Sequence, residues 1–236
     1  MLAPCESKQR AEAVRKLFQK MGASDGEIVS EEIKGVQNIL ITKKGNENET
    51  IIVGAHYDKT AAGCGAIDNW TGIVIIAHLY RVLRTANTHK NYLFVAFDKE
   101  ESGLIGSATM ARSIPKENRS SYCAMVNVDS FGFTYPQVLS NTSSPKMTDL
   151  AKTLAAELKM PFSSASLAAN ADSASFLARD IPAVTFHGLT ALWPQYLHTK
   201  SDKFENVKVP SVRVGYNFLV EYVKRLDTSA CGVFRK

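Results

Sequence analysis

The sequence lacks any long hydrophobic run and any concentration of one kind of charge. Its longest strongly apolar stretch, residues 73–77, is far too short to cross a bilayer. Lys and Arg number 28 against 23 Asp and Glu, and the resulting net charge of +5 is spread along the chain. A nucleic-acid-binding surface would need clustered basic residues. These absences exclude a membrane-spanning protein and argue against a nucleic-acid partner.

Repeats, low-complexity segments and Pro/Gly/Ser-rich linkers are absent as well. With 236 residues, 45% of them hydrophobic and 22% charged, the chain can build one substantial core. We therefore expect a single domain over residues 1–236, and we exclude disordered, collagen-like and coiled-coil proteins. Residues 1–10 lack the apolar stretch of a secretory signal, so we expect any leader to have been removed or never to have existed.

Cysteine is scarce, and no two cysteines form the CxxC pair of a structural zinc site or a redox dithiol. Cys5 and Cys231 lie near the two ends of the chain, and chain termini are often close in space. One hypothesis is therefore a Cys5–Cys231 disulfide in an exported protein. The alternative is four reduced cysteines, two of them in the core. The four are Cys5, Cys64, Cys123 and Cys231.

Apolar periodicity predicts helices that alternate with strands. This order indicates an α/β sandwich with a buried, mostly parallel central sheet. In such sheets ligands bind beyond the carboxyl ends of the strands, so the chemistry is expected there. Helices are predicted over residues 6–21, 72–83, 104–112, 146–159 and 209–226. Strands are predicted over residues 36–42, 51–55, 91–97, 122–128 and 183–186.

Acids and histidines follow these predicted strands and loops. Each one alone would usually be a solvated cap or a loop residue. If the strand ends share one edge of the sheet, however, several carboxylates and two histidines converge, and their mutual repulsion would raise some carboxylate pKa values. One or two divalent cations would remove that conflict, and imidazole plus carboxylate without cysteine suits zinc in an open catalytic site. The residues are His56, Asp58, Asp68, Asp98, Glu100, Glu101, Asp129 and His198.

Asp58 stands two residues after His56. A zinc-bound imidazole usually donates its other N–H to a carboxylate, which fixes the tautomer of the ring. Asp58 could accept that hydrogen bond. The alternative interpretation is that Asp58 is simply a turn residue.

Five segments of the chain resemble, in order, the motifs of the metallopeptidase family of bacterial leucyl aminopeptidases and aminopeptidases Y and S, which also contains the glutaminyl cyclases. The match runs from about residue 36 to 226, and five motifs in the correct order are highly specific. The resemblance implies the zinc-exopeptidase fold, a three-layer α/β sandwich whose mixed, mostly parallel sheet is flanked by helices. The segments are 54–58, 65–69, 97–107, 126–129 and 198–202.

The resemblance also implies a site with two zinc ions per chain. His56 and Asp129 would bind one zinc, Glu101 and His198 would bind the other, and Asp68 would bridge both. The family has a cis peptide bond after its bridging aspartate, so the bond that follows Asp68 is a candidate for the cis form.

The implied reaction is hydrolysis of the N-terminal residue from peptides that have a free N-terminus. Glu100 matches the general base of the family, and Asp58 matches the partner of the first histidine. Aromatic residues near the motifs could line a substrate pocket, although core packing explains them at least as well, and one acid matches a position found in both branches of the family. These candidate substrate-binding residues are Trp70, Phe131, Asp172, Phe186, Trp193 and Tyr196.

Two alternatives stay open. The first is a glutaminyl cyclase, which uses one zinc to form N-terminal pyroglutamate; residues 193–199 resemble its last histidine segment, whereas residues 103–107 follow the glutamate pair as in the peptidases. The second is an inactive peptidase-like binding domain, which usually lacks ligands that this chain retains. We favour a monomer that is secreted or periplasmic, with a cytoplasmic location as the alternative.

Overall fold

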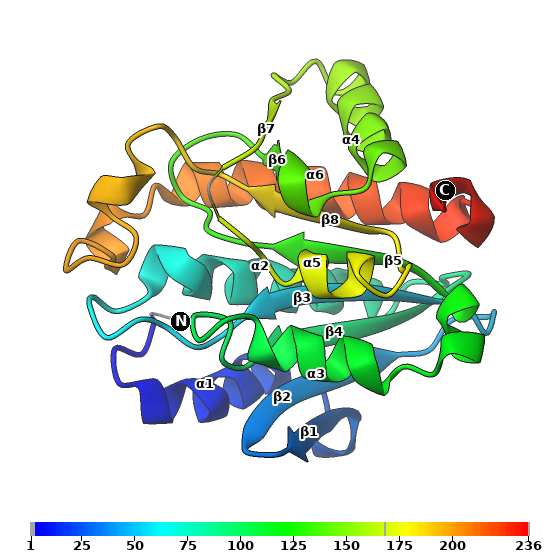
Figure 1. Cartoon of the computed structure of the whole chain (residues 1–236), viewed down its shortest axis with the longest axis horizontal. Coiled ribbons are helices and arrows are strands. Elements are labelled where there is room, and N and C mark those ends of the chain that lie inside the picture. Colours follow the sequence, from blue (N-terminus) through cyan, green and yellow to red (C-terminus); the bar gives the residue numbers. More distant parts are fainter. Residues whose placement is uncertain (1–2, 168, 236) are drawn as a thin grey trace.

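The computed structural model describes residues 3–167 and 169–235, which form a mixed eight-stranded sheet between two layers of helices (Figure 1). The strand order is β1-β2-β4-β3-β5-β8-β6-β7, and the central neighbours β4, β3, β5 and β8 run parallel. This architecture confirms the predicted fold class. The strands are β1 (Ile28–Ile33), β2 (Val36–Lys43), β3 (Thr50–His56), β4 (Asn91–Phe97), β5 (Tyr122–Val128), β6 (Gln137–Leu139), β7 (Ser164–Ala165) and β8 (Ala183–His187).

Helices cover both faces of the sheet. Helices α3 and α5 pack on one face, and α1, α2 and α6 pack on the other, with α4 beside α6 (Figure 1). Across residues 3–167 and 169–235, no helix combines the length and the apolar character that crossing a bilayer requires. The helices are α1 (Ser7–Lys20), α2 (Thr71–Leu83), α3 (Ile105–Ser113), α4 (Pro145–Glu157), α5 (Ser173–Leu177) and α6 (Val209–Thr228).

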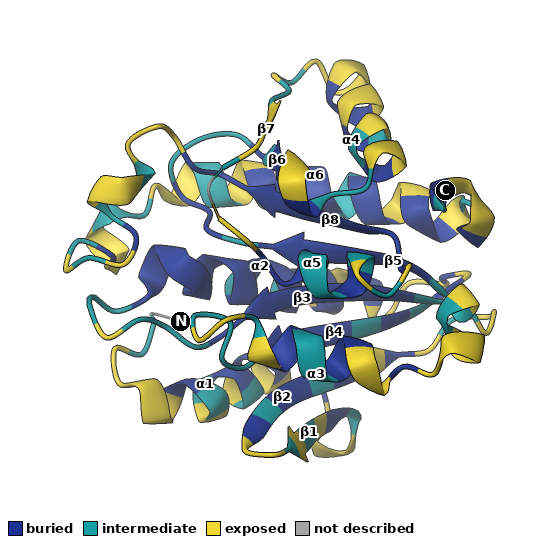
Figure 2. Cartoon of the chain, viewed as in Figure 1, coloured by how far each residue is buried: buried dark blue, intermediate teal, exposed yellow. Residues whose placement is uncertain are grey.

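Strand β3 shows why the sheet is buried on both sides. Successive side chains of a strand point to opposite faces. Ile51 and Val53 therefore belong to the core beneath α1, α2 and α6, whereas Ile52 belongs to the core beneath α3 and α5, and all three are fully buried. Figure 2 shows the same pattern along the central strands, which are buried while the outer faces of the helices are exposed. The continuous apolar runs in the sequence are explained by this two-sided burial.

All the helices and strands predicted from periodicity occur, with ends that differ by at most about two residues, the usual uncertainty of element boundaries. Four short or polar elements were not predicted. Strand β1 contains the polar run Ser30-Glu31-Glu32, and β6, β7 and α5 are too short for a period to be recognised.

The cysteines pair as Cys5–Cys64 and Cys123–Cys231. The predicted Cys5–Cys231 disulfide is therefore wrong, and so is the alternative of four reduced cysteines. The physical reason is that the two ends of the chain lie far apart (Figure 1). Cys5 precedes α1 and is joined to the loop before α2, whereas Cys231 follows α6 and lies against β5.

Candidate metal centre

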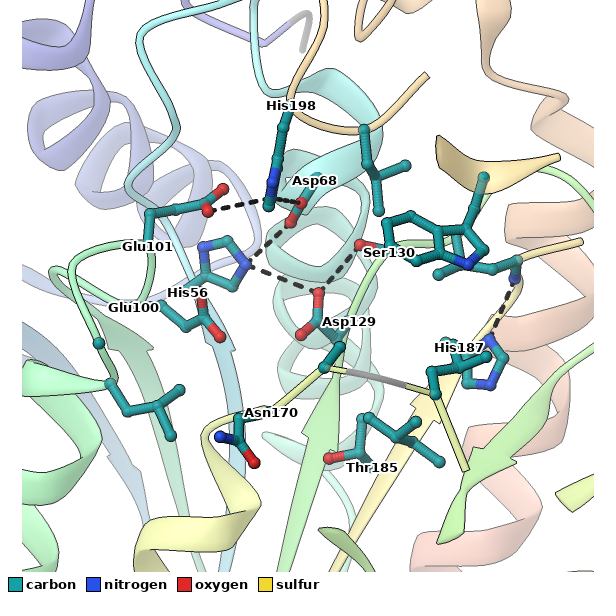
Figure 3. A pocket seen from close by; sticks show the side chains of 18 residues that line it. His56, Asp68, Glu100, Glu101, Asp129, Ser130, Asn170, Thr185, His187 and His198 are labelled. Carbon is teal, nitrogen blue, oxygen red and sulfur yellow. Dashed lines mark hydrogen bonds and ion pairs between the residues drawn. The ribbon is translucent and has the colours of Figure 1, made fainter. Parts of the chain in front are cut away.

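The candidate site lies where the parallel strands end. His56 is the last residue of β3, Glu101 follows β4, and Asp129 directly follows β5. Asp68 comes from the short segment before α2, and His198 from the long loop between β8 and α6. Figure 3 shows the five side chains pointing toward one another. The structure thus brings together the five residues predicted as metal ligands.

Asp68 lies between the two histidines. Its Oδ1 is 3.0 Å from His56 Nε2, and its Oδ2 is 3.1 Å from His198 Nε2. A second carboxylate accompanies each imidazole: Asp129 Oδ1 is 3.6 Å from His56 Nε2, and Glu101 Oε2 is 3.1 Å from His198 Nε2. Two groups of three residues therefore share Asp68, and in each group the potential ligand atoms lie within 4.8 Å of one another.

The crowding of acids changes how strongly they hold protons. Burial, reinforced by the nearby carboxylates, raises the pKa of Glu100 to about 10. Burial and the charge of Asp68 raise the pKa of Glu101 to about 7. The hydrogen bond to Asp68 raises the pKa of His198 to about 9. Without a cation the cluster therefore keeps protons near neutral pH, and a bound divalent cation would displace them.

The donor set fits a divalent metal. Each group offers one imidazole and two carboxylates, and neither group contains a cysteine. Among the described residues, the buried Oε1 of Glu101 has no hydrogen-bond partner, although a buried carboxylate oxygen normally has one. Three such ligands that leave an open position are typical of catalytic zinc.

Asp58 connects the two glutamates to His56. Its carboxylate accepts hydrogen bonds from the main-chain N–H groups of Glu100 and Glu101, at 3.0 and 3.2 Å. Its Oδ1 also lies 3.3 Å from His56 Nδ1, close enough for charge pairing although the alignment is not that of a hydrogen bond. This contact favours a proton on Nδ1 and leaves Nε2 facing Asp68. The contact of Asp58 with the glutamate turn was not predicted.

The segment that carries Asp68 is held by side chains on both sides. The carboxylate of Asp202 accepts hydrogen bonds from the main-chain N–H of Asp68, at 3.3 Å, and of the residue before it, at 2.7 Å. The peptide bond between Asp68 and Asn69 is cis, as the resemblance implied. The Asn69 side chain donates to the Val128 carbonyl at 2.8 Å and accepts from the Ser130 N–H at 3.1 Å. Asp68 is thereby placed relative to the end of β5.

A cavity of about 500 Å³ opens beside the cluster. One part of its lining is acidic and contains the five candidate ligands and Glu100. The rest is mostly apolar, and Figure 3 shows its side chains beyond Asp129 and Ser130. Sequence analysis missed most of this wall, because β6 and residues 167–170 show no usable periodicity. The wall includes Leu139, Leu167, Asn170, Thr185, His187, Leu189, Trp193 and Leu197.

The predicted substrate-binding aromatic residues are mostly elsewhere. Trp193 lines the cavity, whereas Phe131 and Phe186 are buried in the core. Trp70 is buried and lines a second, smaller cavity. Tyr196 packs against another aromatic ring, with 4.9 Å between the ring centroids. The core-packing interpretation therefore describes Phe131 and Phe186 correctly.

Asp172 does not line the cavity either, as far as the described lining shows. It directly precedes α5, and its side chain is fully buried beside the site. Burial raises its pKa to about 7, and the charge of His56 opposes this shift. Asp172 thus lies close enough to His56 for the charges of the two side chains to affect each other.

Comparison with known proteins identifies the family. Residues 38–223, most of the chain, match the family model for Peptidase family M28. The chain belongs to peptidase family M28. This M28 chain is 34% identical over 136 residues to leucine aminopeptidase 1 of Chaetomium globosum, in an alignment that covers 51% of the chain and 33% of the relative. It is 26% identical over 238 residues to a probable leucine aminopeptidase of Trichophyton verrucosum, covering 89% and 60%. The chain thus spans only part of the length of these relatives.

Solved structures show the same fold. LapA of Legionella pneumophila superposes with a TM-score of 0.81 at 20% identity, covering 97% of this chain and 69% of that one. A zinc aminopeptidase from Bacillus subtilis gives 0.72 at 20% identity, covering 85% and 53%. A glutaminyl cyclase from an Acidobacteriales bacterium gives 0.80 at 17% identity, covering 95% and 90%. Aminopeptidases and glutaminyl cyclases therefore share the fold of this M28 chain.

Proposed function

We propose that this chain is a single catalytic domain that removes the N-terminal residue from peptides with the help of two zinc ions. The observation that carries the proposal is that Asp68 belongs to two groups of potential ligands, with one oxygen facing each histidine. His56 and Asp129 would hold one zinc, and His198 and Glu101 the other. Both groups are equally complete, which favours two ions over one.

Glu100 is the proposed general base. Its carboxyl lines the cavity and lies within 4.8 Å of ligand atoms of His56 and Glu101, but it belongs to neither of the two groups that share Asp68. When bound, the zinc pair supplies Lewis acidity, which polarises the scissile carbonyl and acidifies the attacking water. Glu100 would accept the proton of that water and pass it to the leaving amine, so that the amine does not depart as an anion. Asp58 holds the main chain of Glu100 in place for this transfer.

The cavity also suggests how the substrate lies. A peptide begins with a positively charged amine next to its first side chain, and the cavity has an acidic part next to a wall that contains four leucines and Trp193. We place the free α-amine near Asp129 and the first side chain against that wall. Binding of the free amine would restrict cleavage to the first residue. Short peptides and aminoacyl-arylamides are the expected substrates.

Glutaminyl cyclase is the second candidate. The glutaminyl cyclase from an Acidobacteriales bacterium is matched over 90% of its own length. The group of Asp68, Glu101 and His198 alone would suffice for one zinc. An assay with leucine- and glutamine-arylamides, with and without a chelator, together with metal quantification, separates the two. Chelator-sensitive release of arylamine from the leucine substrate with two zinc ions per chain supports the aminopeptidase. Pyroglutamate formation without hydrolysis, with one zinc, supports the cyclase.

We also propose that the protein works in an oxidising compartment, secreted or periplasmic. Disulfides such as Cys5–Cys64 and Cys123–Cys231 persist there and are rare in the cytosol. Titration of free thiols in the denatured, unreduced protein from its natural source tests this. Absence of free thiols supports the proposal, and four free thiols would support the cytoplasmic alternative.

A further inference from the structure

Arg10 is fully buried behind the candidate metal centre, although it belongs to α1, far from the motifs in sequence. Its guanidinium donates hydrogen bonds to main-chain carbonyls of three separate segments. Nε donates to Tyr57, while Nη1 donates to Cys64 at 2.8 Å and Nη2 to Gly65 at 3.2 Å. Nη1 also donates to Pro4, just before α1, at 3.1 Å. Its cationic carbon also lies 5.0 Å from the centre of the Trp70 ring. One side chain thus connects the segment of Tyr57 with the segment of Cys64 and Gly65 and pairs main-chain carbonyls in both.

The segments of Tyr57 and of Gly65 carry ligands of both proposed zinc ions. Tyr57 directly follows His56, and Gly65 begins the short turn that leads to Asp68. The turn is tightly packed: Gly65 has a φ of 57°, and a Cβ there would lie 2.6 Å from Lys59 Cβ and 3.2 Å from Arg10 Nη1. The guanidinium therefore packs closely against the turn.

The charge of Arg10 acts on the site as well. Burial lowers the pKa of Arg10 to about 10, and the carboxylates of Asp58, Asp202 and Asp68 oppose this shift, so the side chain stays charged at neutral pH. A positive charge near the carboxylates reduces their mutual repulsion, but it also repels an incoming cation. Repulsion by the positive charge of Arg10 would weaken metal binding, whereas correct placement of the ligands by Arg10 would strengthen it.

We propose that Arg10 is a positioning residue of the metal centre. Through its hydrogen bonds to the carbonyls of Tyr57, Cys64 and Gly65, the guanidinium sets the distance between His56 and Asp68. This inference rests on the proposed zinc sites and adds a residue of α1 to them.

The test compares Arg10→Lys and Arg10→Met with wild type and with Arg15→Met. Arg15 lies on the same helix and donates to Ser30 of β1, away from the metal centre, so it is the matched control. Metal-free protein is titrated with Co²⁺, followed by visible absorption, and the thermal unfolding of the same samples is recorded. Lys keeps the positive charge but lacks the planar guanidinium that donates to several carbonyls. Arg10→Lys therefore tests the hydrogen bonds of Arg10 separately from its charge.

We expect Arg10→Lys to bind Co²⁺ about 10-fold or more weakly, the usual effect of losing a residue that orients ligands. Arg10→Met also loses the positive charge that repels a cation. Weaker Co²⁺ binding by this variant would therefore mean that losing the placement of the ligands costs more affinity than losing the repulsion gains. Arg15→Met should bind Co²⁺ as wild type does. Folded Arg10→Lys with an affinity within about twofold of wild type would overturn the proposal, since a role confined to folding lowers only the unfolding temperature.

The same data decide the remaining outcomes. If Arg10→Met does not fold, the comparison of Arg10→Lys with wild type decides the question. If wild-type protein binds no Co²⁺, the proposed zinc sites are wrong and the inference about Arg10 is overturned with them. If wild type binds and Arg10→Lys binds equally well, only the inference about Arg10 is overturned.

Discussion

The carboxylate of Asp58 accepts the main-chain N–H of Glu100 at 3.0 Å, so the proposed base is held by the residue that also faces the first proposed histidine ligand. Asp58 thereby links the residues proposed to bind zinc to the residue proposed to move protons.

Asp58→Asn should weaken both functions. The amide keeps one acceptor oxygen but turns an NH₂ group toward either His56 Nδ1 or a main-chain N–H, and both of these are donors in the proposed state. We expect a loss of about 10–100-fold in metal affinity or turnover, measured by zinc titration and kcat. Asp98→Asn is the control, because Asp98 caps the main chain of Gln37 outside the cavity. Unchanged zinc affinity and kcat in Asp58→Asn would contradict the role given to Asp58.

Glu100→Gln should separate chemistry from metal binding. The amide cannot accept the proton of the attacking water, so kcat should fall by roughly 10²–10⁴-fold while the zinc content stays at that of wild type. Steady-state kinetics on a leucine-arylamide and metal analysis of the same sample provide the two readouts. Turnover near the wild-type rate would remove Glu100 from the mechanism.

Asp68→Ala should empty the site. Asp68 contributes one oxygen toward each histidine, so its removal takes a ligand from both proposed zinc ions. Metal analysis after dialysis should find little zinc, and the unfolding temperature of the dialysed variant should no longer respond to added zinc, because a ligand stabilises only a protein that binds it. Full zinc content in this variant would show that Asp68 does not bridge.

Metal uptake should release protons and strengthen as the pH rises. The raised pKa values of Glu101, about 7, and of His198, about 9, mean that the cation-free site still holds protons at pH 7. Metal must displace them, so the apparent affinity should increase between about pH 6 and pH 9. Calorimetric titrations in two buffers of different ionisation enthalpy measure the released protons. An affinity that is flat over this range, with no proton release, is the contradicting result.

Three of the candidate ligands could be predicted from the sequence because their position at strand ends and their chemistry coincide. His56 and Asp129 each end a continuous apolar strand, and the carboxyl ends of parallel strands meet at one edge of the sheet. Glu101 also follows a strand, so the same reasoning applies to it. Asp68 and His198 lie on loops without periodicity; their residue types made them candidates, and the family resemblance gave them their proposed roles.

Other features could not be found in this way. Phe186 and Trp193 are both aromatic residues near a motif. Only the three-dimensional packing shows that Phe186 lies in the core and that Trp193 lines the cavity. Arg10 lies on a polar helix, and an arginine is ordinarily expected at the surface. It is buried because it donates hydrogen bonds to main-chain carbonyls about fifty residues away in sequence. The disulfide partner of Cys5 likewise depends on where α1 packs.

The central claim is that two zinc ions share Asp68, and anomalous diffraction at the zinc edge from crystals of the zinc-loaded protein tests it most directly. We expect two peaks per chain, one beside His56 and Asp129 and one beside Glu101 and His198, both in contact with Asp68. A single peak, or peaks away from Asp68, would contradict the account.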